Sequence, residues 1–283
     1  MKINLAEHAG FCFGVKRALN MVEKHRLKLK PPIKMYGHLV HNEEVVKELT
    51  KKNIEVINSL NQITGGTLII TAHGISPVKR RKIEKMKDVE ILDTTCPRVS
   101  YIHGVVDDLR KENRKVLIFG DREHQEVKGI KGAAGKNSHV FSGPAGLSKL
   151  TLHPRNKIGL VAQTTQNKEK FKKIKKELSE KFSNIVVFDT ICNTASWRQQ
   201  ETRKMASSHD AMVIIGSSSS ANTTRLYQVS KKINPDSYFV STYKGLKKSW
   251  FAGKEKVGVT AGASTPDRVI KDVMGALEKM DIK

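Results

Sequence analysis

The sequence predicts an α/β fold built mainly from parallel strands, and two patterns support this prediction. Short runs rich in Val, Ile and Leu lack a strict alternation of apolar and polar residues, which is typical of parallel strands buried on both faces. Each run is followed by a polar turn and then by an amphipathic stretch at helical spacing. A chain of 283 residues has room for two or three small domains of this kind.

The apolar runs predict nine strands along the chain. The expected strands are Ile33–Tyr36, Thr67–Ala72, Val89–Leu92, Lys115–Phe119, Lys157–Ala162, Ile185–Phe188, Ala211–Ile215, Tyr238–Val240 and Lys256–Thr260. Helix starts are marked by a proline placed directly after a capping or turn residue, because proline fits the first turn of a helix. This pattern occurs at Ser76-Pro77, Cys96-Pro97 and Thr265-Pro266.

A weak internal repeat divides the chain into units of similar size. Two segments share the pattern Asp-Thr-x-Cys, and they end at Cys96 and Cys192. Cys12 lies 84 residues before Cys96, and Cys192 lies 96 residues after it. We therefore expect three α/β units, each with one cysteine at or near its start. The expected units are residues 1–96 with Cys12, His41 and His73; residues 97–192 with His124, Glu126 and Thr164; and residues 193–283 with Ser220, Asn222 and Ser264.

The chain is strongly basic, with 51 Lys and Arg against 28 Asp and Glu and a net charge of +23. Such a charge raises the possibility of nucleic-acid or acidic-protein partners. The basic residues are nevertheless spread along the chain, largely on expected helices. The sequence contains no basic arm, zinc-finger spacing or aromatic RNA-binding signature. A lysine-rich solvated surface is therefore favoured over a nucleic-acid interface.

The sequence predicts a cytoplasmic protein without a membrane-spanning segment. Its longest apolar stretches are far too short to cross a bilayer. The N-terminus MKINLAEHAGFCFG has neither the long apolar core nor the cleavage site of a signal peptide.

The three cysteines leave several interpretations open. An odd number of cysteines argues against a disulfide framework, and the absence of a CxxC pair argues against a structural zinc site. Buried core thiols, one catalytic thiol, or three metal ligands from distant segments remain. All three cysteines fall at expected helix starts, where the helix dipole stabilises a thiolate. Three thiolates suit a [4Fe–4S] cluster with one open iron, and a mononuclear metal site is the alternative.

Polar residues gather in the turns that follow the expected strands. In open α/β sheets ligands bind beyond the carboxyl ends of the strands. Histidines, hydroxyls and amides at helix starts would form a site for an anion such as a phosphate, although no P-loop motif occurs. Glu126 is the carboxyl group available there to carry a proton, and its alternative role is to complement the dipole of its helix. The candidate anion-binding residues are His41, His73, His124, Thr164, Ser220, Asn222 and Ser264.

Taken together, these segments resemble the LytB family of 4-hydroxy-3-methylbut-2-enyl diphosphate reductases. The similarity spans essentially the whole chain, and the order and spacing of the motifs make it specific. The motifs are GFCFGVKRA, VHN, AHG, DTTCP, HQEV, QTT, DTIC with the following RQ, GSSSSANTTRL and VTAGAST with the following PD.

The resemblance implies a fold, a cofactor and a reaction. The fold would be a trefoil of three small α/β domains with pseudo-threefold symmetry around a central cavity. One [4Fe–4S] cluster per chain would be held by Cys12, Cys96 and Cys192, and Glu126 would supply protons. The reaction would remove an allylic hydroxyl to give isopentenyl and dimethylallyl diphosphates. The residues implied to surround the substrate, mainly its diphosphate, are His41, His73, His124, Thr164, Ser220, Asn222 and Ser264.

Three positions depart from the family pattern and motivate an alternative. Gln125 stands where the family usually has proline, Ala221 where a serine is common, and Ala195 where a hydroxyl is usual near the cluster. The alternative is a cluster-binding paralogue that acts on another substrate or senses redox state or iron. A nucleic-acid-binding protein is a second alternative, which rests on charge alone. The charge also fits an acidic ferredoxin or flavodoxin as electron donor to the reductase.

Overall fold

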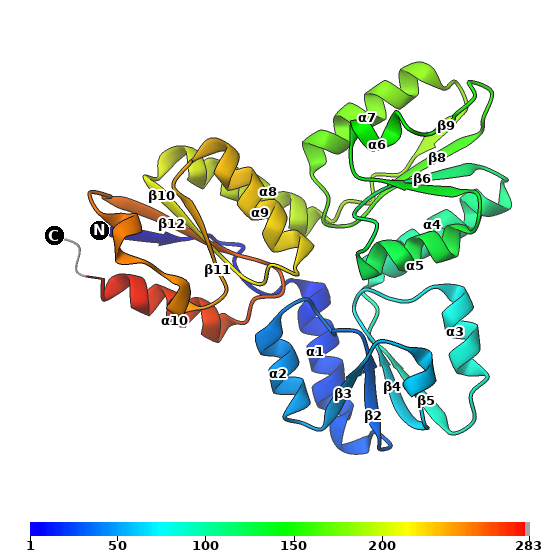
Figure 1. The fold of residues 1–283 in the computed structure, drawn as a ribbon, viewed down its shortest axis with the longest axis horizontal. Coiled ribbons are helices and arrows are strands. Elements are labelled where there is room, and N and C mark those ends of the chain that lie inside the picture. The colour runs from blue at the N-terminus through cyan, green and yellow to red at the C-terminus, as the bar shows by residue number, and fades with distance from the viewer. Residues whose placement is uncertain (281–283) are drawn as a thin grey trace. The chain divides into compact units, whose positions relative to one another are not determined.

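The computed structural model describes residues 1–280, and these fold into twelve parallel strands with helices on the sheets. The described chain divides into two compact units. The first unit combines Met1–Val15, His41–Glu48 and the chain from Asn193 onwards. The second unit combines Lys16–Val40 with Leu49–Cys192. Figure 1 labels most helices and strands of the two units, which are described separately below.

The first unit contains one four-stranded parallel sheet in the order β11-β10-β12-β1. Its inner strands are short apolar runs that are buried on both faces, as expected for parallel strands. The strands are β1 (Lys2–Leu5), β10 (Ala211–Ile215), β11 (Ser237–Val240) and β12 (Lys256–Ala261). The helices are α8 (Asn193–Ser208), α9 (Ala221–Ile233) and α10 (Asp267–Glu278), with short 3-10 turns at Tyr243–Gly245 and Lys248–Phe251. Helix α2 (Glu43–Thr50) also begins in this unit.

The second unit contains two four-stranded parallel sheets, in the orders β3-β2-β4-β5 and β7-β6-β8-β9. The first of these has β2 (Ile33–Tyr36), β3 (Ile54–Ile57), β4 (Gly66–Ile70) and β5 (Val89–Asp93). The other has β6 (Lys115–Phe119), β7 (Ser138–Phe141), β8 (Ile158–Ala162) and β9 (Ile185–Val187). The helices are α1 (Phe13–His25, which begins in the first unit), α3 (Pro77–Glu84), α4 (Pro97–Lys111), α5 (Gln125–Ala134), α6 (Pro144–Leu147) and α7 (Lys168–Lys181), with 3-10 turns at Arg26–Lys28 and Leu60–Gln62.

The three sheets share one spatial arrangement of strands. In the two sheets of the second unit, strands numbered in chain order lie across the sheet as second, first, third, fourth. In the sheet of the first unit, β10, β11 and β12 take the first three of these places, and the N-terminal β1 takes the place of the fourth strand although the chain enters it first. The strand in this last place is called the fourth strand of each sheet below. The predicted α/β class with three similar parallel sheets is therefore confirmed, and the sequence repeat reflects a repeat in the arrangement of strands.

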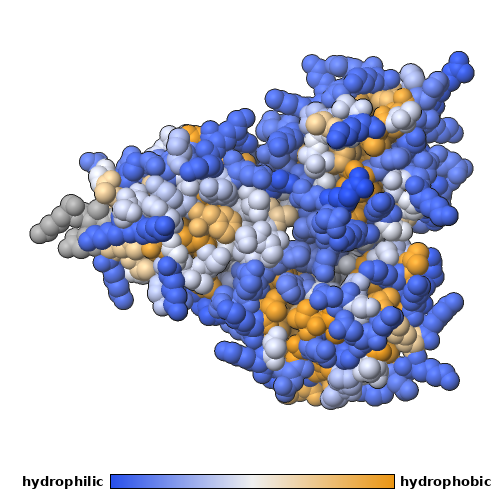
Figure 2. Space-filling view, viewed as in Figure 1, coloured by the Kyte–Doolittle hydropathy of each residue, from blue (hydrophilic) through white to orange (hydrophobic). Residues whose placement is uncertain are grey.

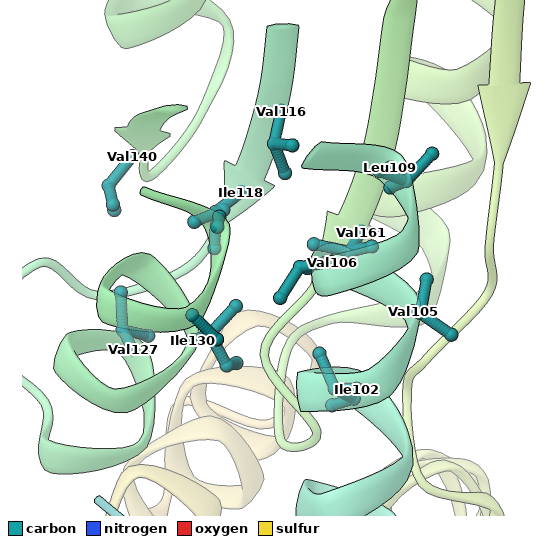
Figure 3. Close-up of a cluster of buried hydrophobic side chains, with 12 residues drawn as sticks. Ile102, Val105, Val106, Leu109, Val116, Ile118, Val127, Ile130, Val140 and Val161 are labelled. Atoms are coloured by element: carbon teal, nitrogen blue, oxygen red, sulfur yellow. The ribbon is translucent and has the colours of Figure 1, made fainter. Parts of the chain in front are cut away.

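Strand β6 shows how each sheet acquires two cores. Val116 and Ile118 point to one face and pack with residues of α4 and α5, as Figure 3 shows. Leu117 and Phe119 point to the other face and pack with α6 and α7. The alternation follows from the two-residue period of a strand. Helices on both faces bury the inner strands of the sheet, which explains why β6 and β8 read as continuous apolar runs.

All nine predicted strands are present in the structure, and three further strands were not predicted. Every predicted strand is present within a few residues, but β1, β3 and β7 were not predicted. Each of the three lies at the edge of its sheet. The prediction searched for uninterrupted apolar runs, and edge strands such as β1 and β3 carry exposed polar residues instead. Their pattern is therefore weaker in the sequence.

The predicted helix starts agree closely with the structure. Ser76 caps α3, and Cys96 directly precedes α4, each with proline at the first helical position. At α10 the proline itself, Pro266, occupies the capping position, so this helix begins one residue later than predicted. The domain boundaries at residues 96 and 192 stay a prediction, and residues 281–283 of the expected third unit lie outside the described residues.

The surface carries the charge that the composition requires. The face in Figure 2 is mostly hydrophilic, with scattered apolar patches between charged side chains. Among the described residues, no helix combines the length and apolar character needed to span a bilayer.

Candidate active site

The three cysteines occupy equivalent places in the three sheets. Each follows the fourth strand of its sheet: Cys12 follows β1, Cys96 follows β5 and Cys192 follows β9. The backbone N–H of each cysteine donates to a carbonyl two residues beyond the end of the third strand. The acceptors and distances are Ala263 at 3.1 Å for Cys12, Ala72 at 3.1 Å for Cys96 and Thr164 at 2.9 Å for Cys192.

The local environment of each cysteine suits a thiolate ligand. None of the three forms a disulfide, and each is half-buried. In each case a helix begins at the next residue, namely α1 at Phe13, α4 at Pro97 and α8 at Asn193. The N–H groups at a helix start favour a negatively charged group beside them. Three equivalent thiolate donors fit the three protein ligands of an iron–sulfur cluster with one open iron.

In the first unit, a group of hydroxyls gathers beyond the carboxyl ends of β10 and β12. Ser220 caps α9 by accepting from the backbone N–H of Thr223 at 3.3 Å. The Ser264 hydroxyl lies 3.4 Å from the Ser220 hydroxyl and donates to the backbone oxygen of His41 at 2.9 Å. Ser264 directly follows Ala263, the residue that accepts the Cys12 N–H. The structure thus brings Ser220, Ser264, Cys12 and the His41 backbone to one end of this sheet.

Asn222 is the strongest indication of a polar ligand in this group. Its side chain is 4% exposed, in the first turn of α9. Neither amide atom, Nδ2 or Oδ1, has a hydrogen-bond partner within residues 1–280. A buried polar group without partners costs about 1–3 kcal/mol, so native proteins rarely leave one unsatisfied. A bound oxyanion would accept from the Nδ2 donor.

In the second unit, Glu126 is a buried carboxyl held by one residue. Its side chain is 2% exposed in the first turn of α5. Oε1 accepts from the Thr164 backbone N–H at 2.7 Å, and Oε2 accepts from the Thr164 hydroxyl at 2.8 Å. Burial raises the pKa of Glu126 to about 7, against the lowering effect of the two Thr164 hydrogen bonds. A carboxyl with a pKa near neutrality is suited to give and take protons.

Thr164 also connects this carboxyl to a cysteine. Its backbone oxygen accepts the Cys192 N–H, while its N–H and hydroxyl hold Glu126. One residue of the loop after β8 therefore positions both the candidate proton carrier and the loop of a candidate ligand.

Two predicted histidines lie together in the second unit. The rings of His73 and His124 meet edge to face, with centroids 5.4 Å apart. His124 caps α5, and its Nδ1 accepts from the Glu126 backbone N–H at 3.2 Å. Because Nδ1 accepts a hydrogen bond, the proton of the neutral ring is on Nε2, which can donate to a ligand. His73 follows Ala72, the acceptor of the Cys96 N–H.

Two arginines that contact the cysteine loops were not among the predicted site residues. Arg198 donates to the backbone oxygen of Gly10, and Arg17 donates to that of Thr95. Both occur within motifs quoted above, GFCFGVKRA and the RQ after the third cysteine. No role was predicted for these two arginines, because an arginine on a helix is usually a surface residue.

Comparison with known proteins decides the family. A model of the LytB protein family matches residues 3–278. The chain belongs to the LytB family. Among its LytB relatives, the 4-hydroxy-3-methylbut-2-enyl diphosphate reductase of Aquifex aeolicus (strain VF5) is 38% identical, over 98% of this chain and 96% of the relative. The enzyme of the same name from Campylobacter lari (strain RM2100) is 39% identical, over 99% of this chain and 98% of the relative.

Solved LytB structures share this fold. The E-1-hydroxy-2-methyl-but-2-enyl-4-diphosphate reductase of Plasmodium falciparum has a TM-score of 0.93 at 32% identity, covering 98% of this chain and 88% of that one. A second structure is described as (E)-4-hydroxy-3-methyl-but-2-enyl diphosphate reductase, the terminal enzyme of the non-mevalonate pathway. It has a TM-score of 0.68 at 37% identity, covering 99% of this chain and all of that one.

The departures from the LytB pattern lie close to the candidate site. Gln125 occupies the first position of α5, between His124 and Glu126, and its side chain covers Gly37. Ala221 is the first residue of α9, and Ala195 is buried near the start of α8. None of the three replaces a cysteine or Glu126.

Proposed function

We propose that this protein is an iron–sulfur reductase of 4-hydroxy-3-methylbut-2-enyl diphosphate. It removes the allylic hydroxyl and yields isopentenyl and dimethylallyl diphosphates. The single observation that carries the proposal is the equivalent placement of Cys12, Cys96 and Cys192 in three sheets with the same spatial arrangement of strands. Membership of the LytB family, whose relatives carry this activity in their names, supports the same substrate.

Cys12, Cys96 and Cys192 are the proposed ligands of one [4Fe–4S] cluster per chain. Three thiolates leave one iron of such a cluster without a protein ligand. When bound, the cluster supplies single electrons and a Lewis acid for the hydroxyl of the substrate. A mononuclear metal site is less suited, because the reaction needs two electrons: the substrate alcohol, two electrons and two protons give the product alkene and water.

The diphosphate is the proposed ligand of the polar groups at the sheet ends. Asn222 offers a buried amide whose partners the described chain does not supply, and Ser220 and Ser264 add hydroxyls beside it. His124 offers an Nε2 donor next to His73. Such donors stabilise an anion through charge-assisted hydrogen bonds. The full set of proposed substrate-binding residues is His41, His73, His124, Thr164, Ser220, Asn222 and Ser264.

Glu126 is the proposed proton carrier. Hydroxide is a poor leaving group, so the C–O bond breaks more easily when the oxygen receives a proton. Burial keeps a fraction of Glu126 protonated near pH 7, whereas an exposed glutamate would be ionised. The Thr164 hydroxyl and N–H stabilise the carboxylate that remains after the proton has left. The residue can then be reprotonated for the next step.

The proposed electron donor is an acidic protein of the ferredoxin or flavodoxin kind. A net charge of +23 attracts an acidic partner and accelerates their encounter. We place the protein in the cytoplasm as part of the same proposal.

A cluster-binding paralogue with another substrate is the second candidate, and Gln125, Ala221 and Ala195 favour it. At Ala221 and Ala195 a hydroxyl donor is missing relative to the family pattern. A hydrogen bond to a charged group contributes about 1.5–3 kcal/mol, so affinity for a diphosphate would fall without replacement donors.

A turnover assay separates the two candidates. Protein purified and reconstituted without oxygen is supplied with reduced methyl viologen and 4-hydroxy-3-methylbut-2-enyl diphosphate. The reductase consumes viologen and releases the two isomeric diphosphates, while Glu126→Gln keeps its iron and loses at least about 100-fold in rate. A protein that binds iron but releases neither product is the paralogue.

A further inference from the structure

Two helices that begin next to cysteines also hold the loops that lead to other cysteines. Helix α1, which follows Cys12, carries Arg17, whose Nη1 donates to the Thr95 backbone oxygen at 3.1 Å. Thr95 directly precedes Cys96. Helix α8, which follows Cys192, carries Arg198, whose Nη2 donates to the Gly10 backbone oxygen at 2.7 Å.

The contact between α8 and the loop before Cys12 is the more extensive one. Arg198 is only 3% exposed, and its Nη1 also donates to the Thr194 backbone oxygen at 3.3 Å. One turn further along the helix, Glu201 accepts from the backbone N–H of Glu7 at 2.6 Å and of His8 at 3.1 Å. Three hydrogen bonds from one helix thus fix the backbone of residues 7–10. Burial removes the water that would solvate the Arg198 guanidinium, and hydrogen bonds to the protein must compensate for that loss.

The loop before Cys96 is held by a second set of contacts. Asp93 Oδ1 accepts from the Thr95 backbone N–H at 2.9 Å and from the Thr95 hydroxyl. Arg17 donates to the Thr95 backbone oxygen. The loop before Cys192 has an apolar contact instead, because Phe188 packs against the core cluster that contains Ile102 of α4. The hydrogen bond from an arginine on a helix that follows a cysteine therefore occurs at two of the three cysteine loops.

We propose that Arg198 and Arg17 are positioning residues that set the backbone of the Cys12 and Cys96 loops and shift the cluster toward its reduced form. The proposal rests on the proposed cluster site. A cysteine loop that is already held in place loses less conformational entropy when a cluster binds to it. In other metal sites, residues that hydrogen-bond to the metal ligands orient those ligands in the same way. A positive charge near a ligand cysteine also favours the reduced, more negative cluster.

Variants at Arg198 separate the two effects. Arg198→Gln removes both the charge and the double donor, whereas Arg198→Lys keeps the charge but cannot bridge two carbonyls in the same way. Glu201→Ala frees the same loop but removes a negative charge. Arg203→Gln is the control, since Arg203 is an exposed arginine on the same helix. Arg17→Gln tests the loop before Cys96.

Two readouts on iron-loaded protein test the proposal. Arg198→Gln and Arg17→Gln should lose iron to a chelator at least threefold faster than the unmodified protein, and their cluster midpoint potentials should be more negative. Arg198→Lys should lose iron faster but keep its potential. Glu201→Ala should lose iron faster and have a less negative potential. Unchanged iron loss and potential in Arg198→Gln would overturn the proposal.

A third readout needs no cluster. In iron-free protein, Arg198→Gln should raise the alkylation rate of Cys12 at least threefold, whereas Arg203→Gln should not change it. If Arg198→Gln fails to fold, Arg198→Lys decides: alkylation and iron loss at the unmodified rates would contradict the positioning role. If the unmodified protein binds no iron, the proposed function is wrong. If it binds iron and the arginine variants keep its iron-loss rate, potential and alkylation rate, only this inference is wrong.

Discussion

Glu126 illustrates how one side chain acquires a function from its surroundings. The sequence identified it as a carboxyl group next to donors, with helix-dipole complementation as the alternative. The structure adds burial and two hydrogen bonds from Thr164, which act on its pKa in opposite directions. Burial is a property of the folded chain, so the raised pKa could not be predicted from the sequence.

Thr164→Val should move the pH dependence of turnover. The substitution removes the hydroxyl bond that stabilises the carboxylate, so the pKa of Glu126 should rise above about 7. Proton donation requires the acid form, and the rate falls as pH rises through this pKa. The decline in kcat should therefore begin about one pH unit higher, since one unit corresponds to 1.36 kcal/mol. Thr164→Ser keeps the hydroxyl and should retain the original profile.

Glu126→Gln should stabilise iron-free protein at neutral pH. The pKa of Glu126 is raised from 4.5 in an ordinary setting to about 7 in the fold. Below pH 4.5 both the folded and the unfolded chain hold the proton, so the carboxyl has no effect on stability there. Between these values only the unfolded chain ionises, and stability falls as pH rises, by about 3 kcal/mol in total. Glutamine cannot ionise, and it keeps an oxygen to accept from Thr164.

Thermal unfolding at a series of pH values measures this difference. The melting temperature of Glu126→Gln should exceed that of the unmodified protein by about 5 °C at pH 7.5, and the gap should close near pH 4.5. A gap that is independent of pH would show that Glu126 ionises in the fold as it does in water.

Strands and helices were predictable where a buried face determined the sequence pattern. Inner strands such as β6 and β8 were found because both of their faces are covered. The edge strands β1 and β3 escaped, since their exposed positions carry polar residues such as Lys2 and Glu55. Strand β7 has no exposed residue, and exposure does not explain its omission. The pairing of β1 with β12 depends on contacts more than 250 residues apart, which no local pattern records.

Two glycine substitutions should have opposite effects on stability. Gly216 has φ +152°, and a Cβ there would lie 2.7 Å from the Thr223 hydroxyl oxygen, so Gly216→Ala should lower stability by about 2 kcal/mol. Gly104 is exposed within α4, and a Cβ there would meet nothing within 4 Å. Gly104→Ala should raise stability by about 0.5–1 kcal/mol, because alanine restricts the unfolded chain. Denaturant unfolding measures both, and an equal loss in the two variants would contradict this account.

At the scale of the whole molecule, the chain repeats one arrangement of strands three times and places one cysteine after each fourth strand. The Asp-Thr-x-Cys repeat predicted two of these places, and the spacing of Cys12 suggested the third. The arginine contacts to the cysteine loops were not predictable, because they join residues 78 and 188 positions apart.

The overall charge predicts how turnover responds to salt. With a flavodoxin or ferredoxin as donor, kcat/KM should fall at least several-fold between low and moderate ionic strength, because salt screens the attraction to a chain of net charge +23. With reduced methyl viologen, a small cationic donor, the same salt should not lower the rate. If the rates with both donors fell equally with salt, the attraction between the basic chain and an acidic protein donor would not explain how the donor binds.

The cysteines carry the central claim, and their iron content tests it most directly. The protein should be purified without oxygen, alongside Cys12→Ser, Cys96→Ser and Cys192→Ser, and iron and sulfide should be counted per chain. We expect a brown protein with roughly four of each, and a marked loss in every serine variant. A colourless protein that takes up no iron on anaerobic reconstitution would contradict the cluster, and the reductase with it.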